Sequence, residues 1–248
     1  MKLREFFVDE IISIPFKLFG KTHVGLLLFL IILCLFIYFN RNKIVLIDEK
    51  IKRRITVFIA LLLLFNMITL YISSFYYQCF DFNTMLPLHL CYLSNYFYIF
   101  TILFQKKKLY PYIYFLAFLG PIPAIIFFDV PSVWEAFNFY LYVISHHILV
   151  IGGFLTFYMY PTSIKKKQFI ILIIVLNLLY FIMSWFNSAF NTNYFFSKSI
   201  PSFIYDVLPF IKYLPLLLVL EVCEIGIASI LYLYFNRQYQ KLMGYLRS

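Results

Sequence analysis

Residues 55–76 read ITVFIALLLLFNMITLYISSFY, and these 22 consecutive positions contain no charged side chain. A helix rises about 1.5 Å per residue, so a segment of this length crosses the roughly 30 Å hydrocarbon core of a bilayer. The basic stretch Lys52-Arg53-Arg54 comes directly before it. A long apolar segment with positive charges at one end is typical of a transmembrane helix, and we expect residues 55–76 to form one.

The composition of the whole 248-residue chain has the same character. Hydrophobic residues make up 63% of it and charged residues only 13%, whereas a soluble domain is about half apolar and a quarter charged. The 32 Phe and 22 Tyr beside 7 Gly fit neither a disordered chain nor a repeat solenoid. Four cysteines without a CxxC pair argue against a disulfide framework and a zinc ribbon. The composition therefore predicts a polytopic membrane protein.

Apolar segments long enough to cross a bilayer occur seven times. We therefore predict an all-α fold, in which residues 23–248 form a single seven-helix transmembrane bundle with short loops. The predicted segments are 24–39, 55–76, 85–104, 109–128, 136–160, 168–187 and 207–235. Pro209 and Pro215 lie in the last segment and predict a kinked or partly re-entrant start, because proline removes a backbone donor.

The distribution of Lys and Arg predicts the orientation of the bundle. Three alternate loops and the C-terminal tail carry fifteen basic residues, whereas the opposite side carries five. The fifteen are Arg41, Lys43, Lys50, Lys52, Arg53, Arg54, Lys106, Lys107, Lys108, Lys165, Lys166, Lys167, Arg237, Lys241 and Arg247. The positive-inside rule then places the C-terminus in the cytoplasm and the N-terminus outside, in a multi-pass protein of the cell membrane.

Residues 1–22 do not resemble a signal peptide, because acidic residues interrupt the basic region and no small-residue cleavage site follows. Phe6, Phe7, Ile11, Ile14 and Leu18 recur at helical spacing between charges. We interpret this segment as an amphipathic helix that lies in the outer membrane interface and ends near Gly20, most simply as an anchor for the first span.

Ionisable groups inside membrane spans are costly, so they are candidates for function. All four histidines fall at the outer boundary or in the outer half of a predicted span. Cys91 lies about six residues into the third span and His146 about ten residues into the fifth, so the two are expected at similar depths. A thiolate nucleophile and an imidazole that accepts and returns its proton are suited to covalent catalysis. The alternative is that Cys91 is an inert buried side chain.

The other polar candidates surround this pair. Asn95 lies one helical turn after Cys91 and is expected to orient it or an oxyanion, whereas His89 faces away from Cys91. Three histidines and a cysteine are also compatible in principle with zinc, but no late paired histidines accompany them, and we predict no metal or cofactor. Glu221 and Glu224 share a face of the last helix, as a structural hydrogen bond or as a proton or headgroup site.

Several motifs occur in a familiar order. They are Leu86-Pro87-Leu88-His89-Leu90-Cys91, Leu18-Phe19-Gly20-Lys21-Thr22-His23, Gly120 with Asp129, Ser145-His146, Asn191-Thr192-Asn193-Tyr194 and Glu221. Together they resemble the YwaF-type family of integral membrane proteins, over about residues 18–235. The sequence departs from that family at Tyr92, and at His147, where the family has glycine.

The resemblance implies a phospholipid acyltransferase. A eukaryotic relative moves a fatty acyl chain from a diacyl phospholipid to an ether lysophospholipid, using a cysteine and a histidine that correspond to Cys91 and His146. Because His147 follows directly, either histidine is left open as the partner of Cys91. The expected substrate contacts are His89, Asn95, His147, Asn193, Tyr194 and Glu221. The expected partners are membrane phospholipids, and neither nucleic acid nor a particular protein is expected.

Three alternatives remain open from the sequence, and one of them is a purely structural membrane protein. Water in place of the lysophospholipid acceptor would make the chain a lipase. A non-enzymatic small transporter or lipid-binding protein would instead use Glu221 and the polar outer loops.

Overall fold

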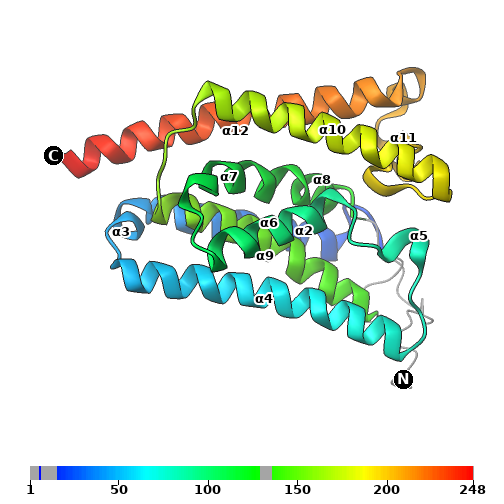
Figure 1. Cartoon of the computed structure of the whole chain (residues 1–248), viewed down its shortest axis with the longest axis horizontal. Coiled ribbons are helices and arrows are strands. Elements are labelled where there is room, and N and C mark those ends of the chain that lie inside the picture. Colours follow the sequence, from blue (N-terminus) through cyan, green and yellow to red (C-terminus); the bar gives the residue numbers. More distant parts are fainter. Residues whose placement is uncertain (1–5, 7–15, 129–135, 248) are drawn as a thin grey trace.

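The computed structural model describes Phe6, residues 16–128 and residues 136–247 (Figure 1). This part of the chain forms helices and no strand, which confirms the all-α prediction. Six helical segments in it are long and apolar enough to cross a membrane. They are α2 (Lys21–Phe39), α4 (Glu49–Tyr76), the segment Lys107–Ile126, α9 (Phe137–Met159), α10 (Lys166–Phe190) and α12 (Leu216–Arg247).

Helix α9 is the centre of the bundle and packs against α2, α4, the short helix α3 (Arg41–Val45) and the helices of the third and fourth predicted spans. Two glycines allow this close packing. A Cβ on Gly152 would lie 2.8 Å from Ile59 Cγ2, and one on Gly153 would overlap the Ala117 side chain. Small residues at helix contacts are typical of membrane bundles, where close backbone approach provides much of the packing energy.

The third predicted span, 85–104, is shorter than expected. Helix α5 (Phe82–Met85) is one turn long, and helix α6 (Leu90–Leu103) has 14 residues. Between them Leu86 is extended, with φ −63° and ψ 142°, as expected for a residue that precedes proline. Helix α6 is too short to cross the hydrocarbon core by itself. The seven-span count therefore stays a prediction.

Prolines also divide the fourth and last predicted spans. Helix α7 (Tyr110–Leu119) stops at Gly120, and helix α8 (Pro121–Ile126) follows. The last span is preceded by α11 (Ser202–Val207) and the 3-10 turn η3 (Pro209–Tyr213), and α12 begins only after Pro215. The predicted break is present, but the helix starts nine residues later than position 207 and continues to Arg247.

Helices α10 and α12 form a pair on one side of the bundle (Figure 1). Their contact with the remainder runs mainly through α7. Asn236 on α12 holds the connection after α9, accepting from Ile164 N at 2.8 Å and donating to Ile164 O at 3.1 Å. Many large apolar side chains of both helices are exposed, as expected for surfaces that face lipid.

The loops rich in Lys and Arg lie at one end of the bundle, together with the C-terminal tail, as expected from the distribution of basic residues along the sequence. Lys107, which precedes α7, reaches Glu49 at the start of α4 with a 4.0 Å Nζ–Oε2 distance. The C-terminus and α3 lie at this end, whereas α5 and α11 lie at the other (Figure 1). The side of the membrane that each end faces stays a prediction, and most of the predicted amphipathic segment 1–22 lies outside the described residues.

Candidate functional site

Tyr194 connects the α10–α11 loop to the segment before Cys91. The side chain is fully buried. Its hydroxyl donates to Phe82 O at 2.5 Å and accepts from Leu86 N at 3.0 Å. It therefore holds the first residue of α5 and the residue that directly follows α5, where the irregular stretch before α6 begins. Because donor and acceptor are both used, the hydroxyl acts here as a positioning group for the backbone that leads to Cys91.

Asn187, at the end of α10, fixes Tyr194 in turn. Its Oδ1 accepts from Tyr194 N at 2.9 Å and from Thr192 Oγ1 at 2.6 Å, and its Nδ2 donates to Tyr194 O at 2.6 Å. Asn191 takes the left-handed conformation, φ 53°, that ends the helix, a conformation that asparagine tolerates well. The Asn-Thr-Asn-Tyr motif is thus a compact hydrogen-bonded loop around Asn187.

Cys91 is the second residue of α6, rather than about six residues into a helix. The difference arises because Pro87 delays the start of the helix. His89 occupies the N-cap position, but no side chain caps this terminus. The first backbone N–H groups of a helix have no partner within it and favour negative charge. Cys91 therefore lies where amide groups favour a thiolate or a developing oxyanion.

Gly120, at the break between α7 and α8, lies against the backbone of Cys91. A Cβ at this position would be 3.1 Å from Cys91 N, 3.1 Å from Cys91 Cα and 3.2 Å from Leu90 C. Only glycine permits this approach without displacing α6. The start of α6 is thus held by Tyr194 through the preceding segment and by Gly120 directly.

His146 is the tenth residue of α9, at the position predicted for it, and is only 9% exposed. Its ring stacks on Tyr142 with centroids 4.1 Å apart. Its Nδ1 lies 2.7 Å from the Tyr142 carbonyl. Because a carbonyl only accepts, Nδ1 carries the proton in the neutral ring and Nε2 keeps a lone pair. This is the tautomer that a general base on Nε2 requires.

The other α9 histidine has a similar tautomer but a different setting. His147 Nδ1 lies 2.9 Å from Val143 O, and its Nε2 is buried without a hydrogen-bond partner among the described residues. His23 is fully satisfied: Nδ1 accepts from Phe19 N at 2.9 Å, and Nε2 donates to Ile125 O at 2.8 Å. His23 therefore joins the start of α2 to the end of α8.

Helices α6 and α9 pack against each other. His89 and His147 are both close enough to His146 to interact with it electrostatically. In the part of the chain that the structure describes, Cys91 Sγ makes no hydrogen bond to a histidine. Catalytic hydrogen bonds are often long without substrate. No group of three His, Cys, Asp or Glu side chains in the described ranges is arranged to hold a metal ion.

The remaining predicted residues are distributed more widely. His89 packs edge-on against Tyr194, with ring centroids 5.0 Å apart. Asn95 is buried, and its Oδ1 has no partner within the described residues. Asn193 is used by its own loop, since its Nδ2 donates to Ser199 O at 2.7 Å. Glu221 lies on α12, outside the α6–α9 contact, and is half-buried.

Two residues with important contacts, Tyr142 and Asn187, are not among the site residues predicted from the sequence. Tyr142 stacks on His146 and donates from its hydroxyl to Ala124 O at 2.8 Å, and its spacing of four residues before His146 is the signal that points to it. Asn187 has no comparable signal in the sequence, and only the fold shows that it organises the loop around Tyr194.

A known protein family matches most of the chain. Residues 18–235 match the TMEM164 family. The chain belongs to the TMEM164 family. The match covers the motifs around His23, Cys91, His146 and Tyr194, and it supports the reading of the chain as a membrane protein. No curated protein and no solved structure matches the chain.

Proposed function

We propose that this member of the TMEM164 family is a membrane-embedded phospholipid acyltransferase that works through a thioester on Cys91. The observation that carries the proposal is the placement of Cys91 at the uncapped start of α6, beside the helix that presents His146 with Nε2 unprotonated. A nucleophile, a base and backbone donors are the three components that acyl transfer needs.

The reaction proceeds in two balanced steps. Cys91 Sγ attacks the ester carbonyl of a diacyl phospholipid while its proton passes to His146 Nε2. The tetrahedral oxyanion collapses, the C–O ester bond breaks, and the proton moves from His146 to the departing lysophospholipid oxygen. A second lysophospholipid then gives its hydroxyl proton to His146 and attacks the thioester; the C–S bond breaks, a new ester forms, and His146 returns the proton to Cys91 Sγ.

The local structure assigns a role to each neighbour in this proposal. Amide N–H groups in the first turn of α6 stabilise the oxyanion, as helix N-termini do for anions. Tyr142 fixes the His146 tautomer through its carbonyl and the ring orientation through stacking. Asn95, with its free buried oxygen, contacts the substrate one turn further along α6. With water as acceptor in the second step, the same site would be a lipase.

Intact mass spectrometry of the purified chain after incubation with diacyl phospholipid tests the proposal. We expect a fatty-acyl adduct that hydroxylamine removes, that is absent from Cys91→Ala and that persists in Cys223→Ala, a matched cysteine variant on α12. His146→Ala should lose the adduct, whereas His147→Ala should retain it. An adduct that persists in Cys91→Ala, or no adduct on the wild-type chain, would refute the thioester mechanism.

A non-enzymatic transporter or lipid-binding protein is the second candidate, and one observation favours it. Glu224 Oε1 is buried without a hydrogen-bond partner among the described residues, one turn from Glu221 on α12. An unpaired carboxyl oxygen within a membrane helix suits a proton or headgroup relay. In that case Cys91→Ser would leave lipid or substrate movement intact, and Glu224→Gln would abolish it.

A further inference from the structure

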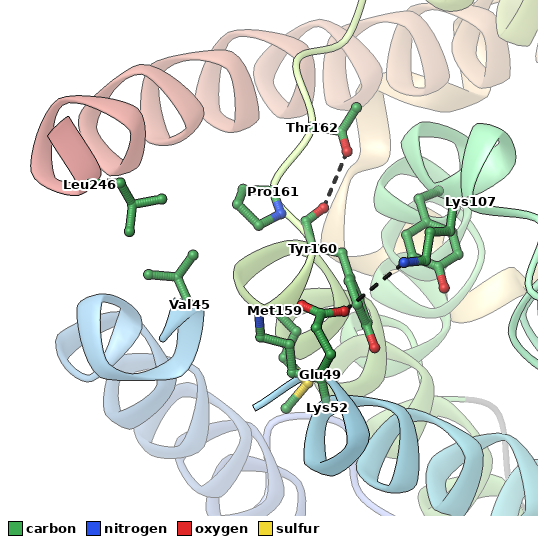
Figure 2. A pocket seen from close by; sticks show the side chains of 10 residues that line it. Val45, Glu49, Lys52, Lys107, Met159, Tyr160, Pro161, Thr162 and Leu246 are labelled. Carbon is green, nitrogen blue, oxygen red and sulfur yellow. Dashed lines mark hydrogen bonds and ion pairs between the residues drawn. The ribbon is translucent and has the colours of Figure 1, made fainter. Parts of the chain in front are cut away.

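A second polar site lies at the opposite, basic end of the bundle from Cys91. It is a cavity of about 450 Å³ where α4 begins and α9 ends, and Figure 2 shows the side chains around it. The wall combines residues of the first, third and fifth connections with the C-terminal part of α12. They are Val45, Glu49, Lys52, Lys107, Tyr110, Met159, Tyr160, Pro161, Thr162 and Leu246.

A second cavity of about 240 Å³ shares one side of the first. Glu49, Lys107, Tyr110 and Tyr160 line both. The second cavity adds Lys50 and Arg53 from the first turns of α4. The two cavities therefore form one polar depression that crosses the ends of three helices.

The charges of this depression are unbalanced. Lys52 is only 6% exposed, and its Nζ lies 2.9 Å from Glu49 Oε1. Lys107 Nζ lies 4.0 Å from the other oxygen of the same carboxylate. The Glu49 carboxylate is thus shared by two ammonium groups, and Lys50 and Arg53 also line the depression. Four cations and one carboxylate leave an excess of three positive charges. Such a concentration of cations attracts an anion.

The Tyr160 ring organises the cations and is itself held in place. Lys52 Nζ and Lys107 Nζ lie 5.7 Å and 5.4 Å from the ring centroid, within cation–π distance. The backbone of Tyr160 is fixed by Tyr114, whose hydroxyl donates to Tyr160 O at 2.6 Å. Two lysines from different segments are therefore directed toward one small region rather than spread over the surface.

The far side of the first cavity is apolar. Val45 and Leu246 lie across the opening from Glu49 and Lys107 (Figure 2), and Met159 and Pro161 also line the cavity. A depression that is cationic on one side and apolar on the other, at the ends of membrane helices, matches the two parts of a phospholipid at the depth of its headgroup. We propose that it binds the phosphate headgroup of an anionic membrane phospholipid, with the start of the acyl chains against Val45 and Leu246.

Thermal unfolding of the purified full-length chain, measured during lipid titrations, tests this site. We expect short-chain phosphatidylglycerol to raise the unfolding temperature saturably, because a ligand that binds the folded state stabilises it. Phosphatidylcholine of the same chain length and inorganic phosphate serve as the zwitterionic and headgroup-only arms. Each should produce less than half of the shift. Equal shifts with inorganic phosphate and phosphatidylglycerol would refute a lipid ligand, and equal shifts with both lipids would refute selection by charge.

Variants locate the effect without disturbing the core. Lys107 and Arg53 are exposed, so the double variant Lys107→Gln/Arg53→Gln should fold normally and bind phosphatidylglycerol at least about tenfold more weakly, as loss of charged hydrogen bonds implies. The control Lys166→Gln/Lys167→Gln removes two charges at the same end but outside the cavity. Equal weakening in both double variants would show general surface attraction and overturn the proposal.

A third variant predicts a change in the opposite direction. Glu49→Gln removes the negative charge that competes with a phosphate for Lys52 and Lys107. It should tighten phosphatidylglycerol binding, and unchanged or weaker binding would contradict the assigned geometry. The cavity lies far along α4, α6 and α9 from Cys91 and His146, so these results do not depend on the acyltransferase proposal.

Discussion

Replacing Gly120 with alanine adds a single methyl group directly against the backbone of the proposed nucleophile. The added Cβ would meet Cys91 N and Cys91 Cα at 3.1 Å and Leu90 C at 3.2 Å. All three are backbone atoms, so no rotamer change removes the overlap. Either α6 moves away by a few tenths of an ångström or the α7–α8 break rearranges.

The size of the effect follows from the cost of overpacking. Extra methyl groups in closely packed cores typically cost about 1–3 kcal/mol. We expect Gly120→Ala to fall in this range, since three contacts are compressed at once. A loss of about 1.4 kcal/mol corresponds to a tenfold change in the ratio of folded to unfolded protein. The displacement would also move Cys91 relative to α9, so acylation should decrease more than stability alone explains.

Two other glycines provide matched controls. Among the described residues, nothing beyond the adjoining backbone of their own helices lies within 4 Å of the position that a Cβ would occupy on Gly25 of α2 or Gly226 of α12. Alanine is favoured over glycine in helices by up to about 1 kcal/mol. Gly25→Ala and Gly226→Ala should therefore unfold at the wild-type temperature or above it, whereas Gly120→Ala should unfold below it. Thermal unfolding of the three variants in one detergent makes the comparison.

Stability and thiol reactivity together can refute the proposed contact between Gly120 and α6. If Gly120→Ala is as stable as the two control variants and its Cys91 reacts with a small maleimide at the wild-type rate, α6 does not rest on Gly120. The position of Cys91 would then be fixed by other contacts, and the argument from the α7–α8 break would fail.

Three further substitutions test the contacts around the site by thermal unfolding. Tyr194→Phe removes two hydrogen bonds and should cost about 1–3 kcal/mol, whereas Tyr180→Phe removes one 3.4 Å bond and should cost less; equal losses would contradict the positioning role of the Tyr194 hydroxyl. Tyr142→Phe keeps the stacking on His146 but loses the bond to Ala124 O, so we expect a loss of about 1 kcal/mol, and no loss would exclude that bond. Hydrogen bonds from the Asn83 backbone and the Thr84 hydroxyl hold the pKa of Asp81 below its ordinary value. The contribution of Asp81 is therefore present above the unfolded pKa of about 3.9 and is lost as the pH falls through the lower folded pKa, so Asp81→Asn should flatten the acid dependence of unfolding, and an unchanged dependence would contradict this.

The lengths of the apolar segments predict most of the helices, because these lengths can be read directly from the order of residues in the sequence. Residues 55–76 and 136–160 are found in α4 and α9 almost as predicted. A prediction from segment length is wrong where a proline interrupts the helix. The apolar stretch 85–104 is long enough to span the membrane, but Pro87 keeps its first residues out of the helix. A hydropathy argument registers Pro87 as a nearly neutral residue, although it changes the depth at which Cys91 lies.

The candidate site was partly predictable for a different reason. The depth of His146 follows from counting along a regular helix, and the structure places it at the expected tenth position. The roles of Gly120 and Asn187 depend on contacts across the fold, to Cys91 and to the loop around Tyr194, that no spacing in the sequence encodes. Similarly, a count of basic residues predicts one charged end but does not show that Lys52 and Lys107 share a carboxylate.

The two helix breaks explain why the site is where it is. Irregular backbone within a membrane bundle is tolerated only where its polar groups are satisfied. Tyr194 satisfies the stretch before α6, while Tyr142 and His23 satisfy the Ala124 and Ile125 carbonyls at the end of α8. Buried or half-buried side chains therefore support the stretch before α6 and the end of the short helix α8 that follows the break at Gly120. The first interruption places the start of α6 inside the bundle, and the second provides the glycine on which it rests. A helix start that no side chain in the described ranges caps, on a helix that packs against α9, is the consequence, and discontinuous helices that bring a terminus into a bundle are a recurrent way to bind anionic groups in membrane proteins.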